Sequence, residues 1–337
     1  MKLLSIIVPC YNSQNYMGHC IDSLLPGAAD VEIIIVDDGS TDQTAGIAES
    51  YRRQYPEVVQ VIHQENRGHG GAINAGLARA AGSFVKVVDS DDWVDGEAYR
   101  KILDTLKAFP ETARPDVVIS NYVYEKEGKR RKMAIRYSHI MPQGRIFTWA
   151  DLGHIPKGRY ILMHSIIYRR DILDNCNLQL PEHTFYVDNL YAYIPLRYSK
   201  TLYYLNVDFY RYYIGRSGQS VQEDVMIRRI DQQLFVNRLM VSAFNPEAIG
   251  EKQKRRYLLN YLEIVTLASS ALLLRGGTAE HLQKKRELWQ YIRDNNEWLY
   301  NKLRHSFLGH LVHLPGSTGR NISVSIYYFS RQVVGFN

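Results

Sequence analysis

Cysteine is scarce in this chain, and its scarcity excludes two kinds of architecture. Of 337 residues only three are cysteines, Cys10, Cys20 and Cys176. They show none of the close spacings of zinc or iron–sulfur ligands, and three thiols cannot form the disulfide framework of a small secreted domain. We therefore expect a protein of a reducing compartment whose fold depends on a hydrophobic core.

Signatures of several nucleotide-binding and membrane proteins are also missing. There is no Walker-type G-K-[ST] sequence, and Ile73 stands where a dinucleotide fingerprint beginning at Gly68-x-Gly70 requires a small residue. No signal-peptide pattern follows Met1, and the longest apolar segment, about 264–274, is shorter than a transmembrane helix. The sequence therefore predicts a cytoplasmic protein that is at most peripheral to the inner face of the plasma membrane.

The composition is that of an ordinary globular protein with a mild positive excess. Hydrophobic residues make up 45% of the chain and charged residues 23%, and the formal net charge is +6. This excess favours anionic substrates or a membrane surface, whereas no module of interleaved basic and aromatic residues points to nucleic acid. The 25 tyrosines, concentrated after Asn121, suit carbohydrate binding, although ordinary packing explains most of them.

Strands and helices alternate regularly over the first part of the chain. Such alternation produces β-α-β units and a mostly parallel, Rossmann-like sheet flanked by helices. A flexible turn is expected at 68–71, before a helix that begins near Ala72. The expected buried strands of this part span residues 3–9, 31–36, 58–63 and 84–88.

Beyond Pro115 the pattern changes from alternation to a few strands followed by helices. The amphipathic character of the last segments indicates a helical C-terminal part. We predict an α/β protein with a catalytic domain, residues 1–220, and a mainly α-helical extension, residues 221–337, that contacts an acceptor, a second subunit or a membrane. The expected strands span 116–124, 159–168 and 202–213, and the expected helices 225–244, 252–274 and 278–304.

Carboxylates gather at the ends of the expected strands. Asp89 and Asp91 end the strand at 84–88, two positions apart, where they can converge on one divalent cation and leave positions open for phosphate oxygens. A D-x-D sequence alone is also typical of a solvated turn. Its placement favours a site, because ligands of parallel sheets collect at the carboxyl ends of the strands, where Asp38 and the segment 9–12 also fall.

Other polar residues near these strand ends permit two interpretations each. Asp38 can accept hydrogen bonds from a nucleobase or ribose, or it can cap the next helix. The glycines at 68–71 allow a ligand or another backbone to approach closely, and Arg67 beside them can meet a phosphate, a base or only solvent. His164, on an apolar strand, is expected to be a core histidine whose hydrogen bonds are satisfied.

The second half of the catalytic domain offers a general base and a donor-rich segment. Asp188 lies in an aromatic stretch, and apolar surroundings raise a carboxyl pKa and make a better base. Glu182 competes for that role, and either acid could instead cap a helix at 189–198. The segment 210–220, which ends in Ser220, suits a lid over a diphosphate or a plain connection after a strand.

Three segments together resemble the family 2 glycosyltransferases of GT-A fold. They read Ser-Ile-Ile-Val-Pro-Cys-Tyr-Asn at 5–12, Val-Asp-Asp-Gly-Ser-Thr-Asp at 36–42 and Val-Val-Asp-Ser-Asp-Asp-Trp at 87–93. Each is common alone, but in this order and spacing, over about the first 120 residues, they are highly specific. The parts around Asp188 and Ser220 are similar to bacterial members that build surface polysaccharides and extend the resemblance to about residue 225.

The resemblance implies transfer of a sugar, with inversion, from a nucleotide donor, usually a UDP-sugar, to a hydroxyl of a glycan or lipid-linked glycan. It implies that Asp91, with Asp89, coordinates Mn²⁺ or Mg²⁺, and that Asp188 takes the proton from the acceptor hydroxyl. The family often has Glu-Asp at this point, whereas this chain has Val187-Asp188. The residues implied to hold the nucleotide and diphosphate are Pro9, Tyr11, Asn12, Asp38, Arg67, Asn74, Asp89 and Ser220.

Two rival functions and two further expectations accompany this assignment. A nucleotidyltransferase usually has a Gly-rich, basic loop after its first strand, where this chain has Pro9-Cys10-Tyr11-Asn12. A degenerate, non-catalytic sugar-nucleotide-binding protein would not need its acidic residues. The presence of Asp38, Asp89, Asp91 and Asp188 therefore argues against this second rival. The Q-x-x-R-W sequence of processive synthases is absent, so we expect a non-processive enzyme. A homodimer and peripheral membrane contact are the other two expected associations.

Overall fold

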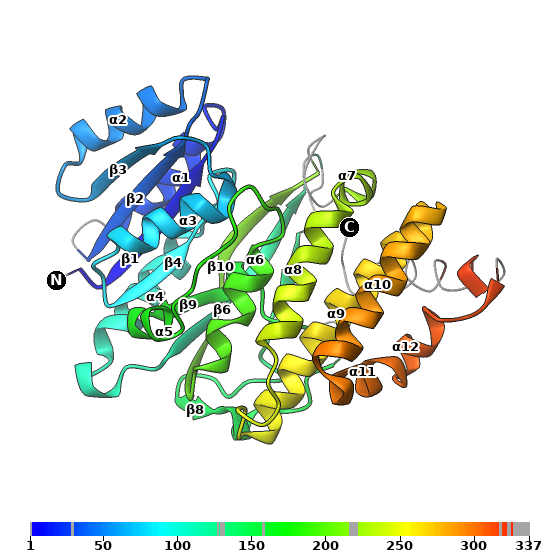
Figure 1. Ribbon diagram of the computed structural model, residues 1–337. Helices are drawn as coiled ribbons and strands as arrows, with labels where there is room; N and C mark the ends of the chain where they lie inside the picture. Colours follow the sequence, from blue (N-terminus) through cyan, green and yellow to red (C-terminus); the bar gives the residue numbers. More distant parts are fainter. Residues whose placement is uncertain are drawn as a thin grey trace. The chain divides into compact units, whose positions relative to one another are not determined.

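The chain folds into two compact units in the computed structural model. One comprises Met1–His154 with Ile161–Ser217, and the other comprises Ile155–Tyr160 with Gly218–Asn337. The first unit holds a sheet flanked by helices, and the second consists mainly of helices (Figure 1). The structure describes residues 2–27, 30–126, 128, 132–156, 159–215, 222–316, 319–321 and 325.

A ten-stranded mixed sheet forms the centre of the first unit. The strand order is β3-β2-β1-β4-β9-β6-β10-β5, with β7 paired to β6 and β8 to β10. Strands β1 to β4 pair in parallel, β9 runs antiparallel to β4 and β6, and β6 pairs in parallel with β10. The strands are β1 (Leu4–Cys10), β2 (Val31–Asp38), β3 (Val59–Gln64), β4 (Phe84–Val87), β5 (Trp93–Val94), β6 (Val117–Lys126), β7 (Met133–Ile135), β8 (Ile146–Thr148), β9 (Ile166–Arg169) and β10 (Thr201–Ile214).

Helices cover both faces of β1, which explains why that strand is apolar apart from Ser5. Leu4, Ile6 and Val8 belong to a core cluster with residues of α1 and α4. Ile7 faces the other side and meets α3 at Gly76, where a Cβ would lie 2.3 Å from Ile7 Cγ2. The helices of this unit are α1 (Met17–Leu24), α2 (Thr44–Gln54), α3 (Gly68–Arg79), α4 (Gly96–Ala108), α5 (Arg170–Asn175) and α6 (Asp188–Tyr193).

Three sequence-based boundaries in this unit were wrong. The glycines at 68–71 are the first turn of α3 rather than a flexible turn before Ala72. The strand expected at 159–168 is the shorter β9, because the chain first makes a 3-10 turn, η4 (Met163–Ser165). The helix expected at 189–198 ends early and continues as a separate 3-10 turn at Pro195–Arg197.

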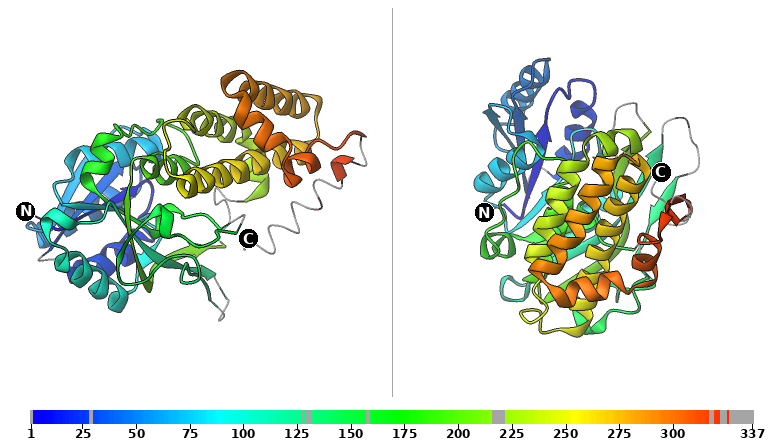
Figure 2. Two further views of the ribbon diagram at one scale, coloured as in Figure 1. Left: turned by 90° about the horizontal axis from the view of Figure 1, so that it is seen from below. Right: turned by 45° about the vertical axis from the view of Figure 1, so that its right-hand side comes forward.

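The second unit contains six helices among its described residues, of which α8, α9 and α10 pack side by side (Figure 2). Two expected helices are divided. The first breaks at Arg229, and the second breaks at Asn296, whose Oδ1 accepts a hydrogen bond from Leu299 N at 2.8 Å and so starts a new helix. They are α7 (Glu223–Arg228), α8 (Ile230–Ala243), α9 (Lys252–Gly276), α10 (Ala279–Asn295), α11 (Glu297–Arg304) and α12 (Phe307–Leu311).

Helix α9 is longer than the apolar segment expected there. Its 25 residues include a window with mean hydropathy 1.5, so by length and composition it could span a membrane. The expectation that no segment reaches that length was therefore wrong. However, 78% of that window is buried inside the protein, as in the central helix of a helical core.

The close approach of α3 to β1 gives a stability prediction. Gly76→Ala should lower the free energy of unfolding by about 1–2 kcal/mol, because the new methyl group must displace Ile7 in a packed core. Urea denaturation followed by circular dichroism measures the change. Gly96→Ala is the control, since a Cβ there meets nothing within 4 Å. Unchanged stability of Gly76→Ala would contradict this packing.

Candidate active site at the strand ends

The carboxyl ends of β1, β2 and β4 lie side by side at one edge of the sheet. Cys10, the last residue of β1, is paired with Asp37 of β2. The segments that follow β1 and β4 meet directly, because Ser13 Oγ lies 2.7 Å from Ser90 Oγ. The residues predicted from the three strand ends therefore gather in one region.

Asp38 is buried at the end of β2 with one carboxylate oxygen engaged. Its Oδ1 accepts hydrogen bonds from Gln64 Nε2 at 2.7 Å and from Arg67 N at 2.8 Å. No residue in the described part of the chain bonds to Oδ2. The carboxylate that bonds to Thr44 N, at the start of α2, is that of Asp42, at 2.9 Å. Asp38 is therefore not the cap of that helix.

The loop after β1 combines a buried, an exposed and a fixed residue. Pro9 is buried within β1, whereas 54% of the Tyr11 surface is exposed, so that its ring can meet a ligand. Asn12 adopts a left-handed conformation with φ of 49°. Its backbone N donates to Ser40 Oγ at 3.0 Å, and its Oδ1 accepts from Thr41 N at 2.9 Å. Asn12 thus fixes the turn after β2.

The start of α3 packs against a distant segment of backbone. A Cβ on Gly70 would lie 2.3 Å from Pro181 O, and one on Gly68 would lie 2.9 Å from His183. The glycines therefore allow another backbone to approach, which is one of the two predicted alternatives. Asn74 continues this contact, since its carboxamide donates to Leu180 O at 2.8 Å and accepts from Leu180 N at 3.0 Å.

Arg67 and Glu182 form an ion pair, with Arg67 Nη1 3.7 Å from Glu182 Oε1. About half of each side chain is exposed to solvent. Nothing in the described residues places a nucleotide beside Arg67 or Asn74, so their assignment to the nucleotide pocket stays a prediction. Their observed contacts hold the segment before Asp188 against α3.

His69 stands among the predicted acids, although sequence analysis did not single it out. Its Nε2 lies 2.9 Å from Asp89 Oδ1. Burial alone would lower the pKa of His69, but the hydrogen bond and charge of Asp89, with the charges of Asp188 and Asp38, raise it above the ordinary value. Conversely, burial would raise the pKa of Asp89, yet His69 outweighs this effect and lowers it. Asp89 is thus held ionised.

The turn after β4 presents three acids in different environments. Asp92 is buried, with Oδ2 accepting from Tyr210 Oη at 2.6 Å and Oδ1 from Tyr213 N at 2.8 Å. Burial, reinforced by the charge of Asp89, raises the pKa of Asp92 well above its ordinary value. Asp91 is half-buried in the same turn.

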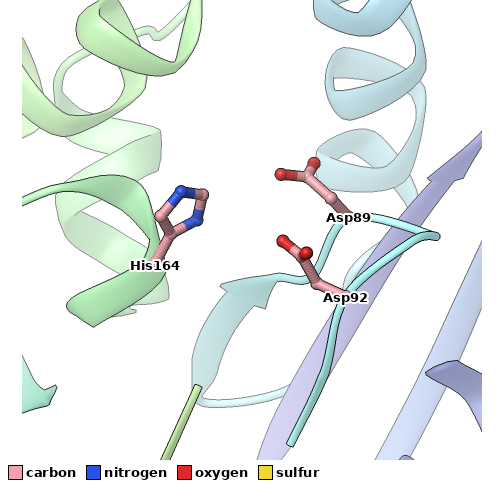
Figure 3. Close-up of side chains that lie close together, drawn as sticks. All are labelled: Asp89, Asp92 and His164. Atoms are coloured by element: carbon pink, nitrogen blue, oxygen red, sulfur yellow. The ribbon is translucent and has the colours of Figure 1, made fainter. Parts of the chain in front are cut away.

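Two acids of this turn and one histidine from η4 form a group of potential metal ligands. Ligand atoms of Asp89, Asp92 and His164 lie within 4.8 Å of one another (Figure 3). Asp91 was predicted as a ligand with Asp89 and does not belong to this group, so its role stays a prediction. Asp89 Oδ2 is not bonded to any described residue. A divalent cation therefore fits at Asp89, because an ionised carboxylate with an unbonded oxygen is a suitable ligand.

His164 differs from its expected state. It is buried in η4, and burial lowers its pKa to about 4, so the ring is neutral. Its Nδ1 finds no hydrogen-bond partner among the described residues, so the expectation of a satisfied core histidine was wrong. The reason is its packing: the ring stacks on Tyr210, with centroids 4.7 Å apart.

Asp188 is the first residue of α6 and is half-buried. Burial raises its pKa, the charge of His69 opposes this, and the charge of Asp89 adds to it. The direction is that required of a general base near neutral pH. Glu182 is more exposed and is paired with Arg67. Ser220 lies outside the described residues.

The charge of His69 gives a testable pH dependence. His69→Gln keeps a neutral donor but loses the ion pair with Asp89, so we expect a loss of about 1 kcal/mol in the free energy of unfolding, given the partial exposure of the pair. Because the pKa of Asp89 is lowered and that of His69 raised, the loss should be largest between the ordinary values of 3.8 and 6.5.

That loss should fade as the pH falls through the lowered pKa of Asp89 and as it rises through the raised pKa of His69. Chemical denaturation across this range measures it. His139→Gln is the control, since His139 is exposed and has no side-chain partner among the described residues. A loss that does not vary with pH would contradict the ion pair.

Comparison with known proteins places these features in a family. The sequence model described as "Glycosyl transferase family 2" matches residues 5–175. The "Putative glycosyltransferase EpsH" of Bacillus subtilis is 29% identical over 288 residues, which cover 80% of this chain and 76% of EpsH. The "Poly(ribitol-phosphate) beta-N-acetylglucosaminyltransferase TarS" of Staphylococcus aureus is 31% identical over 187 residues, 54% of this chain but only 30% of TarS.

Solved structures share the fold. A crystal structure of S. aureus TarS 1–349 matches with a TM-score of 0.68 and 21% identity, covering 99% of this chain and 92% of that chain. The structure of the same protein in complex with UDP-GlcNAc matches with a TM-score of 0.62 and 21% identity. The mannosyltransferase PcManGT from Pyrobaculum calidifontis, in complex with GDP-Man and Mn²⁺, matches with a TM-score of 0.52 and 14% identity, covering 98% and 86%.

The predicted GT-A fold with a helical C-terminal region is confirmed by these matches. The family match covers β1 to β4 and the turn that carries Asp89 and Asp91. Glycosyl transfer is therefore the activity of this chain, and the rival assignment to a nucleotidyltransferase finds no support. The chain belongs to the family 2 glycosyltransferases.

Proposed function

We propose that this enzyme transfers a sugar from a UDP-sugar to a hydroxyl of a glycan or lipid-linked glycan, with a divalent cation and with inversion. One observation carries the proposal. The charges of Asp38, Asp89 and Asp188, which come from three separate elements, all act on His69. The acids assigned to the nucleotide, the cation and the acceptor thus all raise the pKa of one side chain, which Asp89 contacts directly at 2.9 Å.

The nucleotide assignment is supported by the strand ends. Asp38 Oδ2 has no described partner and can accept from the uracil edge, while the exposed Tyr11 ring offers a flat surface. Pro9 and Asn12 shape this loop, Arg67 donates its backbone N–H to Asp38, and Asn74 holds the segment before Asp188 against α3. The complex of TarS with UDP-GlcNAc supports a uridine nucleotide, whereas that of PcManGT with GDP-Man shows that the fold also accepts guanosine.

Mn²⁺ or Mg²⁺ would be held by Asp89 and Asp91. Such a cation, when bound, stabilises the charge that develops on the leaving diphosphate. Asp89 suits this role because His69 keeps it ionised while leaving Oδ2 unbonded. The PcManGT complex contains Mn²⁺ together with GDP-Man, which supports a divalent cation in the proposed reaction.

Asp188 would act as the general base. It removes the proton of the acceptor hydroxyl while that oxygen forms a bond to the anomeric carbon. The bond from this carbon to the diphosphate breaks, the nucleoside diphosphate leaves with the bonding electrons, and the configuration inverts. A raised pKa makes Asp188 a stronger base for this step than an ordinary carboxylate.

A carbohydrate acceptor is supported by the surface beside this base. Phe185, three residues before Asp188, is 38% exposed, and an aromatic face suits the apolar side of a sugar ring. TarS acts, by its name, on poly(ribitol-phosphate), which supports a role in cell-surface polysaccharide biosynthesis. We further propose a non-processive enzyme in the cytoplasm, at the inner face of the plasma membrane, that forms a homodimer.

Two substitutions separate the roles of the acids. Asp188→Asn should lower kcat by about 10²–10⁴-fold, the usual contribution of a positioned base, without weakening UDP binding. Asp91→Asn should weaken UDP binding in the presence of Mn²⁺ by on the order of tenfold or more. UDP release from a panel of UDP-sugars gives kcat, and calorimetry gives the affinity.

Glu182→Gln tests the competing candidate for the base: it removes only an exposed ion pair, so turnover should fall far less than in Asp188→Asn. Addition of EDTA should abolish turnover of the wild-type enzyme. Equal losses of UDP affinity in Asp188→Asn and Asp91→Asn would contradict this division of roles, and full activity in EDTA would contradict the metal.

A further inference from the structure

A lysine lies fully buried in the strand that leads to the candidate metal ligands. Lys86 is the third residue of β4 and is 0% exposed, opposite Ile6 of the central strand β1. Removing an ammonium group from water is costly unless other groups compensate its charge. Its neighbours in β4 are apolar, so the position needs an explanation from the surrounding elements.

Backbone carbonyls and an aromatic ring surround the ammonium group. Lys86 Nζ donates to Met163 O at 2.9 Å and to His164 O at 2.6 Å, both in η4. It also lies 4.8 Å from the centroid of the Tyr210 ring. No carboxylate of the described residues forms an ion pair with it. Burial lowers the pKa of Lys86 to about 7, and the charges of Asp89 and Asp92 act in the opposite direction.

The two elements that Lys86 contacts are those that support the acidic turn. Tyr210 Oη donates to Asp92 Oδ2 at 2.6 Å and accepts from Asp89 N at 3.2 Å. The His164 ring stacks on the Tyr210 ring, with centroids 4.7 Å apart. Figure 3 shows His164 facing Asp89 and Asp92 from η4. Lys86 therefore connects η4 and β10 beneath the turn.

We propose that Lys86 is a positioning residue for glycosyl transfer: its hydrogen bonds to η4 and its contact with the Tyr210 ring hold these two elements under the turn that carries Asp89 and Asp92. In this arrangement Asp92 and His164 form the support of the turn, and Asp89 and Asp91 are the residues that would hold the cation. The link to catalysis rests on the proposed function, whereas the effect on the turn does not.

The first test measures the turn itself. Lys86→Met keeps an unbranched side chain that is one atom shorter, but it removes the charge and both hydrogen bonds. Amide hydrogen exchange of the full chain, without nucleotide or metal, should become on the order of tenfold faster in peptides covering 88–94 and 205–213. Peptides of α8 and α9 should not change. Phe84→Leu, a core substitution in the same strand, is the control for general destabilisation.

Both variants are compared at a temperature where thermal unfolding shows them fully folded. Exchange at 88–94 that rises no more in Lys86→Met than in Phe84→Leu would overturn the proposal. The second readout is UDP affinity with Mn²⁺, which should fall by on the order of tenfold in Lys86→Met alone, as for other residues that orient metal ligands. A wild-type enzyme that binds no UDP would refute the proposed donor but leave the exchange test decisive.

Tyr210→Phe keeps the test decisive where Lys86→Met fails to fold. This variant retains the ring beside Lys86 but loses the hydroxyl that joins it to Asp89 and Asp92. It should accelerate exchange in the same peptides. The double variant should be no more affected than the worse single variant, since both residues act through one connection. Unchanged exchange in Tyr210→Phe, or additive effects, would overturn the proposal.

Discussion

Carboxylates can gather at the edge of this sheet only because positive groups compensate them. An isolated buried carboxylate would be strongly disfavoured. His69 meets Asp89 directly at 2.9 Å, and its charge also acts on Asp38 and Asp188. From beneath, Lys86 acts on Asp89 and Asp92. The turn η4 holds Lys86 through two backbone carbonyls, and the first turn of α3 carries His69.

The same charges give the acids different properties. The pKa of Asp89 is lowered, which suits a residue that must stay ionised to bind a cation. The pKa of Asp188 is raised, which suits a residue that must take up a proton during the reaction. Enzymes commonly divide acid, base and ligand roles among carboxylates through such differences in environment. Asp92, held by Tyr210, takes a third role as part of the support.

Local sequence patterns were sufficient for β1, β2 and β4 and for the acids at the ends of β2 and β4, because both faces of these strands are buried and most of their residues are apolar. They were insufficient where distant residues decide the structure. Gly68 and Gly70 lie in the first turn of α3, and glycine is needed there because the backbone at 181–183 approaches closely. Lys86 and His69 were missed for a similar reason: the partners of Lys86 lie 77 and 78 positions away, and only a lone lysine in an apolar strand hinted at them.

A manganese anomalous-difference map from crystals grown with Mn²⁺ and UDP would locate the cation relative to these acids. The arrangement described here predicts one peak within bonding distance of the Asp89 and Asp91 carboxylates, with the uracil beside Asp38. A peak bound by Asp92 and His164 in place of Asp91, or a nucleotide seated away from the ends of β1, β2 and β4, would contradict it.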